Sequence, residues 1–221
     1  MPGRALLQAI RNTGRSGKVI LSGEDRIRNI LKKYRVGIAG LGGLGSNAAT
    51  ALVRAGVKKF VLVDFDRVEA SNLNRQYFFA DQIGKLKTAA LRENLFRIYE
   101  DLEIEIINDR LEKGRMTKHF KKCDIVIEAL DAADKKEALI IEMQEHLAGI
   151  PLVAASGVGG MGPSDGIRTV KTGNLYLCYN DAGRENDVLI SSRVCIMANW
   201  EANLALEIML EMENGKDNGQ R

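Results

Sequence analysis

A loop of glycines is the first feature of this sequence that could do chemistry. It reads Gly-Leu-Gly-Gly-Leu-Gly and satisfies the pattern Gly-x-Gly-x-x-Gly. In that pattern Gly40 allows a tight turn, Gly42 lets the backbone approach a phosphate, and Gly45 lets a helix pack close to a strand. N–H groups at the start of the helix would face a bound anion. The sequence therefore predicts that Gly40, Gly42, Gly43 and Gly45 contact a nucleotide, and glycines that serve only close packing are the alternative.

Two acids follow the next apolar run. Asp64 ends that run, where an acid accepts hydrogen bonds from a ribose, although a solvated carboxylate would also suit this position. Asp66 either helps to hold a metal ion or caps a turn. NAD and ATP both fit the loop and these acids.

Polar and cationic residues continue the pattern. Asn72 and Asn74 supply amide donors and acceptors, and Arg75 suits two-pronged binding of phosphate oxygens. Lys87 brings a second cation at the expected start of a helix. The two cations predict a polyphosphate site, and the alternative for each is a structural ion pair.

Carboxylates recur after a later strand, at Glu128 and Asp131. Asp131 suits Mg²⁺, which prefers carboxylate together with phosphate oxygens. Hydride transfer would instead need a proton-transfer group near a nicotinamide. The two histidines, His119 and His146, lie in polar stretches without an obvious partner and are predicted to be surface residues. Two cations and a suitable acid for Mg²⁺, without a candidate proton-transfer group, favour MgATP over NAD as the ligand.

The elements that must position these side chains follow from apolar patterning. Short apolar runs predict strands, and apolar residues at helical spacing predict helices. Strands are expected at 35–40, 59–64, 103–108, 123–129 and 151–156, with a hairpin of 167–170 and 175–178. Helices are expected at 24–33, 44–55, 86–99, 133–147 and 193–212. The alternation predicts an α/β fold: a Rossmann-like, doubly wound, mostly parallel sheet with a late antiparallel extension.

Composition sets limits on the class of protein. The chain has 221 residues, of which 45% are hydrophobic and 28% charged, with a net charge of +3. This small charge gives no case for a nucleic-acid binder, and no run approaches the roughly 20 apolar residues of a membrane span. Three cysteines and no secretory leader suit the cytoplasm. One ATP-binding domain is expected over 20–212, after a flexible or dimer-exchanged segment at 1–19 and before a disordered tail at 213–221.

Four motifs in order resemble one known family. Gly-Leu-Gly-Gly-Leu-Gly, Asp-Phe-Asp, Ser-Asn-Leu-Asn-Arg-Gln and Gly-Lys-Leu-Lys are similar to the ThiF/MoeB/HesA family, relatives of the ubiquitin-activating enzymes. The resemblance covers residues 20 to 212, and the late part of the chain resembles the shorter ThiF-type members.

The resemblance implies an activity, which is adenylation. The C-terminal glycine carboxylate of a ubiquitin-like sulfur carrier protein, ThiS-like and ending in Gly-Gly, would attack the α-phosphate of MgATP and release pyrophosphate. By motif, Asp64 would bind ribose, Arg75 and Lys87 would contact phosphates beside Asn72, and Asp131 would serve the metal or the nucleotide. A carboxylate nucleophile is already ionised, so no general base is required. A homodimer is the family expectation.

The chain also departs from the family pattern. It lacks the paired Cys-x-x-Cys motifs of many relatives, so no zinc site is predicted. Leu130 and Ala132 flank Asp131 where many relatives carry Thr and Asn. Cys178 and Cys195 are the candidates for a covalent intermediate with the carrier, and Cys195 is expected to be a small core residue. An N-terminal arginine from a partner subunit reaches ATP in some relatives, and Arg11 and Arg15 are the candidates here.

Several functions stay open at this stage. The leading one is adenylation of a ThiS-like carrier of thiamine biosynthesis, and a MoaD-like carrier would use the same site. A tRNA modification that begins with adenylation is a further alternative. A NAD-dependent oxidoreductase and a nucleotide-binding scaffold without turnover complete the set.

Overall fold

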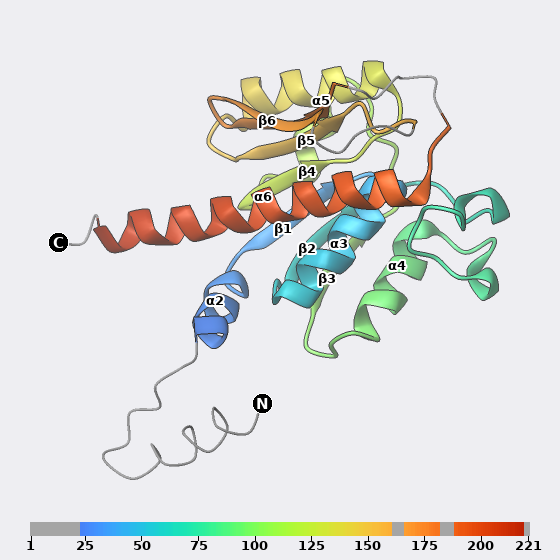
Figure 1. The fold of residues 1–221 in the computed structure, drawn as a ribbon, viewed down its shortest axis with the longest axis horizontal. Coiled ribbons are helices and arrows are strands. Elements are labelled where there is room, and N and C mark those ends of the chain that lie inside the picture. The colour runs from blue at the N-terminus through green and yellow to red at the C-terminus, as the bar shows by residue number, and fades with distance from the viewer. Residues whose placement is uncertain (1–22, 161–165, 182–187, 219–221) are drawn as a thin grey trace, which may run out of the picture.

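The structure is a computed structural model that describes residues 23–160, 166–181 and 188–218. Its centre is a sheet of seven strands in the order β3-β2-β1-β4-β5-β7-β6 (Figure 1). The strands are β1 (Arg35–Ala39), β2 (Lys59–Val63), β3 (Glu103–Ile107), β4 (Ile125–Glu128), β5 (Leu152–Ser156), β6 (Ile167–Thr172) and β7 (Leu175–Asn180). All neighbours pair in parallel except β6 and β7. The predicted fold class, including the late antiparallel pair, is confirmed.

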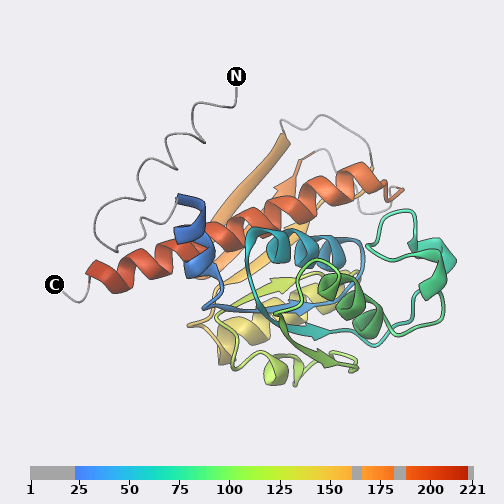
Figure 2. The same ribbon diagram turned by 90° about the horizontal axis from the view of Figure 1, so that it is seen from below.

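Helices cover both faces of the sheet (Figure 2). They are α2 (Gly23–Leu31), α3 (Gly43–Ala55), α4 (Lys87–Phe96), α5 (Ala133–His146) and α6 (Ser191–Asn218), with short 3-10 helices η1 (Ala70–Asn72), η2 (Ala80–Gln82) and η3 (Met116–His119). Residues of α3, α4 and α6 share one hydrophobic core, and residues of α5 and η3 share a second core on the opposite face. In the described part of the chain, no helix has the length and apolarity to cross a membrane.

The alternation of side chains along the strands explains the two cores. In β2, Phe60 and Leu62 belong to the core with α3 and α6, whereas Val61 and Val63 belong to the core with α5. Because both faces are covered, the central strands are continuous apolar runs, which is the pattern of buried parallel strands.

The strand order creates a crevice. From β1 the chain first builds outward through β2 and β3, and β4 and β5 then continue on the other side of β1. Ligands of open α/β sheets bind at such a switch point, beyond the carboxyl ends of the strands. The loops that follow β1, β2 and β4 are therefore the ones that can build a site.

One boundary differs from the sequence prediction. Helix α6 continues to Asn218, so the predicted disorder from 213 onward is wrong for 213–218. Glu213 accepts a hydrogen bond of 3.0 Å from the Tyr34 hydroxyl and forms an ion pair with Lys33. Lys216 lies over the Tyr34 ring. These contacts with the segment after α2 hold the end of the helix. Residues 219–221 and the predicted N-terminal segment 1–19, with Arg11 and Arg15, lie outside the described residues.

Candidate nucleotide-binding site

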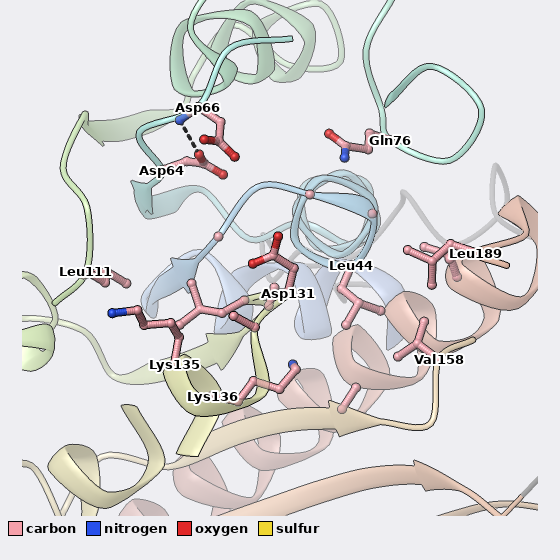
Figure 3. Close-up of a pocket in the computed structure, with 18 of the residues that line it drawn as sticks. Leu44, Asp64, Asp66, Gln76, Leu111, Asp131, Lys135, Lys136, Val158 and Leu189 are labelled. Atoms are coloured by element: carbon pink, nitrogen blue, oxygen red, sulfur yellow. Dashed lines mark hydrogen bonds between the residues drawn. The ribbon is translucent and has the colours of Figure 1, made fainter. Parts of the chain in front are cut away.

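A pocket of about 840 Å³ lies at the carboxyl ends of the central strands (Figure 3). Of the residues predicted to form the site, those that line it are Gly40, Gly42, Gly43, Asp64, Asp66, Arg75, Lys87 and Asp131. Figure 3 shows Asp64 and Asp66 on one side of the glycine loop and Asp131 on the other. Segments far apart in the sequence therefore meet around one cavity.

The glycine loop has the shape that an anion site needs. Gly40 has a φ of +94°, and a Cβ there would lie 2.6 Å from the carbonyl oxygen of Ala129. A Cβ at Gly45 would overlap the carbonyl oxygen of Gly40, so Gly45 serves the predicted close packing of α3 and does not line the pocket. Gly42 caps α3 without any side-chain hydrogen bond. The N-terminus of α3 therefore offers its backbone N–H groups to the pocket.

Asp64 connects the end of β2 to the glycine loop. Its Oδ2 accepts a hydrogen bond of 2.6 Å from the Leu41 N–H, and its Oδ1 accepts one of 2.7 Å from the Asp66 N–H. Burial raises the pKa of this carboxyl, and the hydrogen bond from Asp66 and the nearby charge of Lys87 oppose that rise. Each oxygen keeps acceptor capacity, so the carboxylate can still receive hydroxyl groups from a ligand.

The two predicted cations both lie at the pocket. Lys87 is almost fully buried and donates a hydrogen bond of 3.1 Å to Oδ2 of Asp66. Arg75 donates from Nη1 to the Ser71 carbonyl and to Oδ1 of Asn74. Lys87 thus forms an ion pair with Asp66 and also lines the pocket. These partners hold two cations beside the N-terminus of α3, which is an arrangement that suits a polyphosphate.

Asn72 and Asn74 do not line the pocket. Asn72 Oδ1 accepts a hydrogen bond from the Glu69 N–H and closes a capping box around η1. Asn74 bonds to the Arg75 guanidinium. Both amides therefore shape the turn that carries Arg75.

The far side of the pocket comes from the connection between β4 and α5. Asp131 is exposed there, beside Lys135 and Lys136 (Figure 3). The described residues contain no cluster of three or more His, Cys, Asp or Glu side chains that could hold a metal ion. A Mg²⁺ ion would fit here only with Asp131 as a protein ligand and nucleotide oxygens as the others, which is a common way for proteins to bind it.

Comparison with known proteins identifies the family. The family model described as the ThiF family matches residues 15–217. The chain belongs to the ThiF family. Molybdopterin-synthase adenylyltransferase from Salmonella typhimurium is 34% identical over 143 residues, which are 64% of this chain and 57% of that protein. Ubiquitin-like modifier-activating enzyme 5 from Dictyostelium discoideum is 39% identical over 115 residues, which are 52% of this chain and 28% of that protein.

Solved structures support the fold of this ThiF-family chain. The E. coli tRNA N6-threonylcarbamoyladenosine dehydratase in complex with ATP has a TM-score of 0.74 and 21% sequence identity. The match covers 86% of this chain and 91% of that one. The chain spans only 28% and 57% of the two curated relatives above, so their substrates and partners enter below as proposals.

Other pocket residues of this ThiF-family chain were missed by the sequence reasoning. Gln76 lines the pocket next to Arg75, and Lys136 donates a hydrogen bond of 2.7 Å to Oε2 of the buried Glu128. Further missed residues that line the pocket are Phe65, Asp109, Arg110, Leu111, Lys135, Val158, Leu189 and Val194.

The first turn of α3 holds the segment that carries Arg75. Asn47 donates a hydrogen bond to the carbonyl of Arg75, and Ser46 accepts one from the Tyr77 N–H. The sequence signal available for Ser46 and Asn47 was that both are polar and lie in the first helical turn after a glycine loop.

The histidine predictions need one correction. His119 has a partner, because its Nε2 lies 2.8 Å from Oδ2 of Asp109. Lys118 and then His119 lower the pKa of that carboxyl to about 2. Asp109 lines the pocket and His119 does not. The site therefore presents no histidine for proton transfer among the described residues.

The cysteines divide by exposure. Cys178 and Cys123 are buried, and burial raises the pKa of both thiols, Cys123 to about 12. Cys195 is partly exposed, so its prediction as a core residue is wrong. A buried thiol with a raised pKa is a poor nucleophile. Of the two candidates for a covalent intermediate, the geometry favours Cys195.

Proposed function

We propose that this protein uses ATP to adenylate the C-terminal glycine carboxylate of a ubiquitin-like sulfur carrier protein. One observation carries the proposal. The N-terminus of α3, which has no side-chain hydrogen bond at its cap, lies with Arg75 and Lys87 around a cavity that Asp131 also lines. Membership of the ThiF family supports nucleotide transfer over hydride transfer, because the site has cations for a polyphosphate and no histidine for proton transfer among the described residues.

The reaction is a displacement at phosphorus. A carboxylate oxygen of the carrier forms a bond to the α-phosphorus, and the bond from that phosphorus to the bridging oxygen of the β-phosphate breaks. Pyrophosphate takes the electron pair and leaves, and the carrier becomes an acyl-adenylate. The carboxylate is already ionised at neutral pH, so the protein needs to position the reactants and neutralise developing charge on the phosphates.

Each residue of the site has a role in this proposal. Asp64 accepts hydrogen bonds from the ribose hydroxyls, the glycine loop and α3 bind phosphate oxygens through backbone N–H groups, and Arg75 and Lys87 bind the phosphates by charge. Asp131 would hold Mg²⁺, whose charge neutralises phosphate oxygens when it is bound. Asn72 and Asn74 shape the Arg75 turn, as the geometry around η1 supports.

The identity of the carrier is a finer proposal. A ThiS-like protein ending in Gly-Gly is our first choice, because the late part of the chain resembles the shorter ThiF-type members. The names of the relatives also point to other carriers, including those of molybdopterin synthesis and of ubiquitin-like modification. We expect a homodimer, which light scattering of the purified protein would test.

The experiment is isotope exchange between pyrophosphate and ATP, with the arginine removed. We expect Arg75→Ala to abolish carrier-dependent exchange while the protein stays folded, because Arg75 lines the pocket and its charge would bind the phosphates. Arg67→Ala is the matched control, since Arg67 is exposed, bonds to the Gly84 carbonyl and does not line the pocket. Near-normal exchange by Arg75→Ala would remove this residue from the mechanism.

A second candidate is adenylation of a modified adenosine in tRNA. The observation in its favour is the structural match to the E. coli tRNA dehydratase over 86% of this chain, together with a 30% identical match in sequence. The net charge of +3 is small for a tRNA enzyme. Salt-sensitive tRNA binding, with ATP turnover that depends on tRNA and ignores every carrier, would select this candidate.

A further inference from the structure

The side-chain amide of Gln76 has no hydrogen-bond partner among the described residues, although it lies in the wall of the pocket. The residue is 9% exposed and lines the cavity. Its Oε1 is buried and accepts no hydrogen bond, and its Nε2 donates none to a residue that the structure describes. Buried polar groups are nearly always bonded, so an unpartnered amide calls for an explanation.

Gln82 shows how a glutamine with a structural role is bonded in the same part of the chain. It is 3% exposed and does not line the pocket. Its Nε2 donates to Oδ1 of Asn94 at 2.9 Å and to the carbonyl of Ala90 at 3.3 Å. Its Oε1 accepts from Nδ2 of Asn94 at 3.0 Å and from the N–H of Phe79 at 3.1 Å. Both polar atoms of this amide are satisfied inside the protein, whereas neither polar atom of Gln76 is.

The backbone holds Gln76 beside the N-terminus of α3. The carbonyl of Arg75 accepts a hydrogen bond of 2.9 Å from Nδ2 of Asn47. The N–H of Tyr77 donates one of 3.0 Å to Oγ of Ser46. The residues on both sides of Gln76 are therefore bonded to the first turn of α3, which fixes the direction in which the Gln76 side chain leaves the backbone.

The amide nitrogen of Gln76 points toward the glycine loop. Nε2 lies 3.8 Å from the place where a Cβ would stand on Gly42, which is the N-cap of α3. Figure 3 shows this nitrogen, rather than the oxygen, directed toward the helix that carries Leu44. The first backbone N–H groups of a helix have no partner within it and attract anions. A side-chain N–H donor thus joins the backbone donors where an anion would bind.

We propose that Gln76 is a phosphate-binding residue whose Nε2 donates a hydrogen bond to a phosphate oxygen of the nucleotide. The inference rests on the proposed function in one respect, which is that the ligand carries phosphates. Arg75 and Lys87 bring positive charge to the pocket, and both also donate hydrogen bonds to groups of the protein. Nε2 of Gln76 gives up no such bond within the described residues when it turns to a ligand. A charged acceptor makes the resulting hydrogen bond stronger than one between neutral groups.

The unbonded amide should make the free protein less stable than it could be. A buried polar group without a partner is unfavourable, and an apolar side chain of similar shape removes that penalty. Gln76→Met should therefore have a Tm equal to or above that of the wild type. Gln82→Met is the matched control and should have a lower Tm, because its loss leaves the amide of Asn94 and the N–H of Phe79 without their partner.

Calorimetric titration of the full chain with MgATP tests the proposal. We expect Gln76→Met to bind MgATP roughly tenfold more weakly, because a hydrogen bond to a charged acceptor is lost. Gln76→Glu keeps the shape of the side chain, accepts hydrogen bonds and donates none. Its negative charge would also repel the phosphates, so we expect a roughly 100-fold loss of affinity. Gln82→Met, measured below its Tm, should bind as the wild type does. If Gln76→Met fails to fold, Gln76→Leu gives the same comparison.

Four results would overturn the assignment of Gln76 to the phosphates. The first is wild-type affinity in Gln76→Met. The second is an affinity of Gln76→Glu equal to or above that of the wild type, which would show that the residue accepts a hydrogen bond. The third is a lower Tm in Gln76→Met with an equal loss of affinity in Gln82→Met, which would show a structural role. The fourth is an unchanged Kd for MgATP with a raised KM for the carrier, which would place the donor at the carrier's carboxylate. A wild-type protein that binds no MgATP at all would instead contradict the proposed function.

Discussion

Lys87 offers the sharpest test of the site, because its loss should affect ligand binding far more than stability. Its side chain is 8% exposed, and its partner Asp66 is 45% exposed. An ion pair with so exposed a partner contributes less than about 1 kcal/mol to the free energy of unfolding. A hydrogen bond from a buried ammonium to a phosphate is of the charged kind and contributes about 1.5–3 kcal/mol. Lys87→Met should therefore raise the Kd for MgATP roughly 10- to 150-fold.

The neighbouring Lys85 is the matched control for this substitution. It is 44% exposed, pairs with Glu93 and does not line the pocket. Calorimetric titration with MgATP and thermal unfolding would be measured for Lys87→Met and Lys85→Met side by side. A Kd for Lys87→Met within threefold of the wild type, or an equal loss of affinity in Lys85→Met, would refute the assignment of Lys87 to the phosphates.

Three further predictions follow from the geometry. Gly45→Ala should lower Tm by roughly 2–12 °C, from an overpacking cost of about 1–3 kcal/mol. Gly215→Ala is the control and should not lower Tm, because Gly215 is an open helical position. Equal Tm values for the two variants would contradict the close packing of α3. Because the pKa of Glu201 is raised in the folded protein, wild-type stability falls as pH rises above the ordinary glutamate pKa. Glu201→Gln should therefore gain stability relative to the wild type between pH 5 and pH 8. Urea titrations in which the two proteins differ in free energy of unfolding by the same amount at every pH would contradict the raised pKa of Glu201. A thiol reagent should label Cys195 in the native protein and the other two cysteines only after unfolding, and rapid labelling of all three would show that this burial is wrong.

The sequence predicted the parts of the site that depend on short-range patterns. Local sequence patterns determine the glycine loop between an apolar strand and a helix, and also Asp64 at the end of the next strand. Because β1 and β2 pair in parallel, the loop and Asp64 then lie at the same edge of the sheet. Arg75 and Lys87 were found because each follows a recognisable motif. The amides Asn72 and Asn74 belong to the same motif, yet their role is decided by the turn that they close.

Contacts between distant segments could not be predicted in this way. The acid Glu201 on α6 is buried because α6 packs across β4 and β5. The polar residues after 212 carry no helical apolar pattern, and the helix continues there because Glu213 bonds to Tyr34 at the other end of the chain. Such features depend on tertiary packing, which a single sequence does not reveal.

Carrier-dependent exchange of pyrophosphate into ATP tests the central claim most directly. The protein would be mixed with MgATP, labelled pyrophosphate and a ThiS-like or MoaD-like carrier, in parallel with the same carrier lacking its terminal Gly-Gly. The proposed adenylation predicts exchange only with an intact carrier, because the carboxylate of the terminal glycine is the nucleophile and a shortened tail would not bring its carboxylate to the α-phosphate. ATP binding without exchange on either carrier, or equal exchange with the truncated carriers, would contradict it.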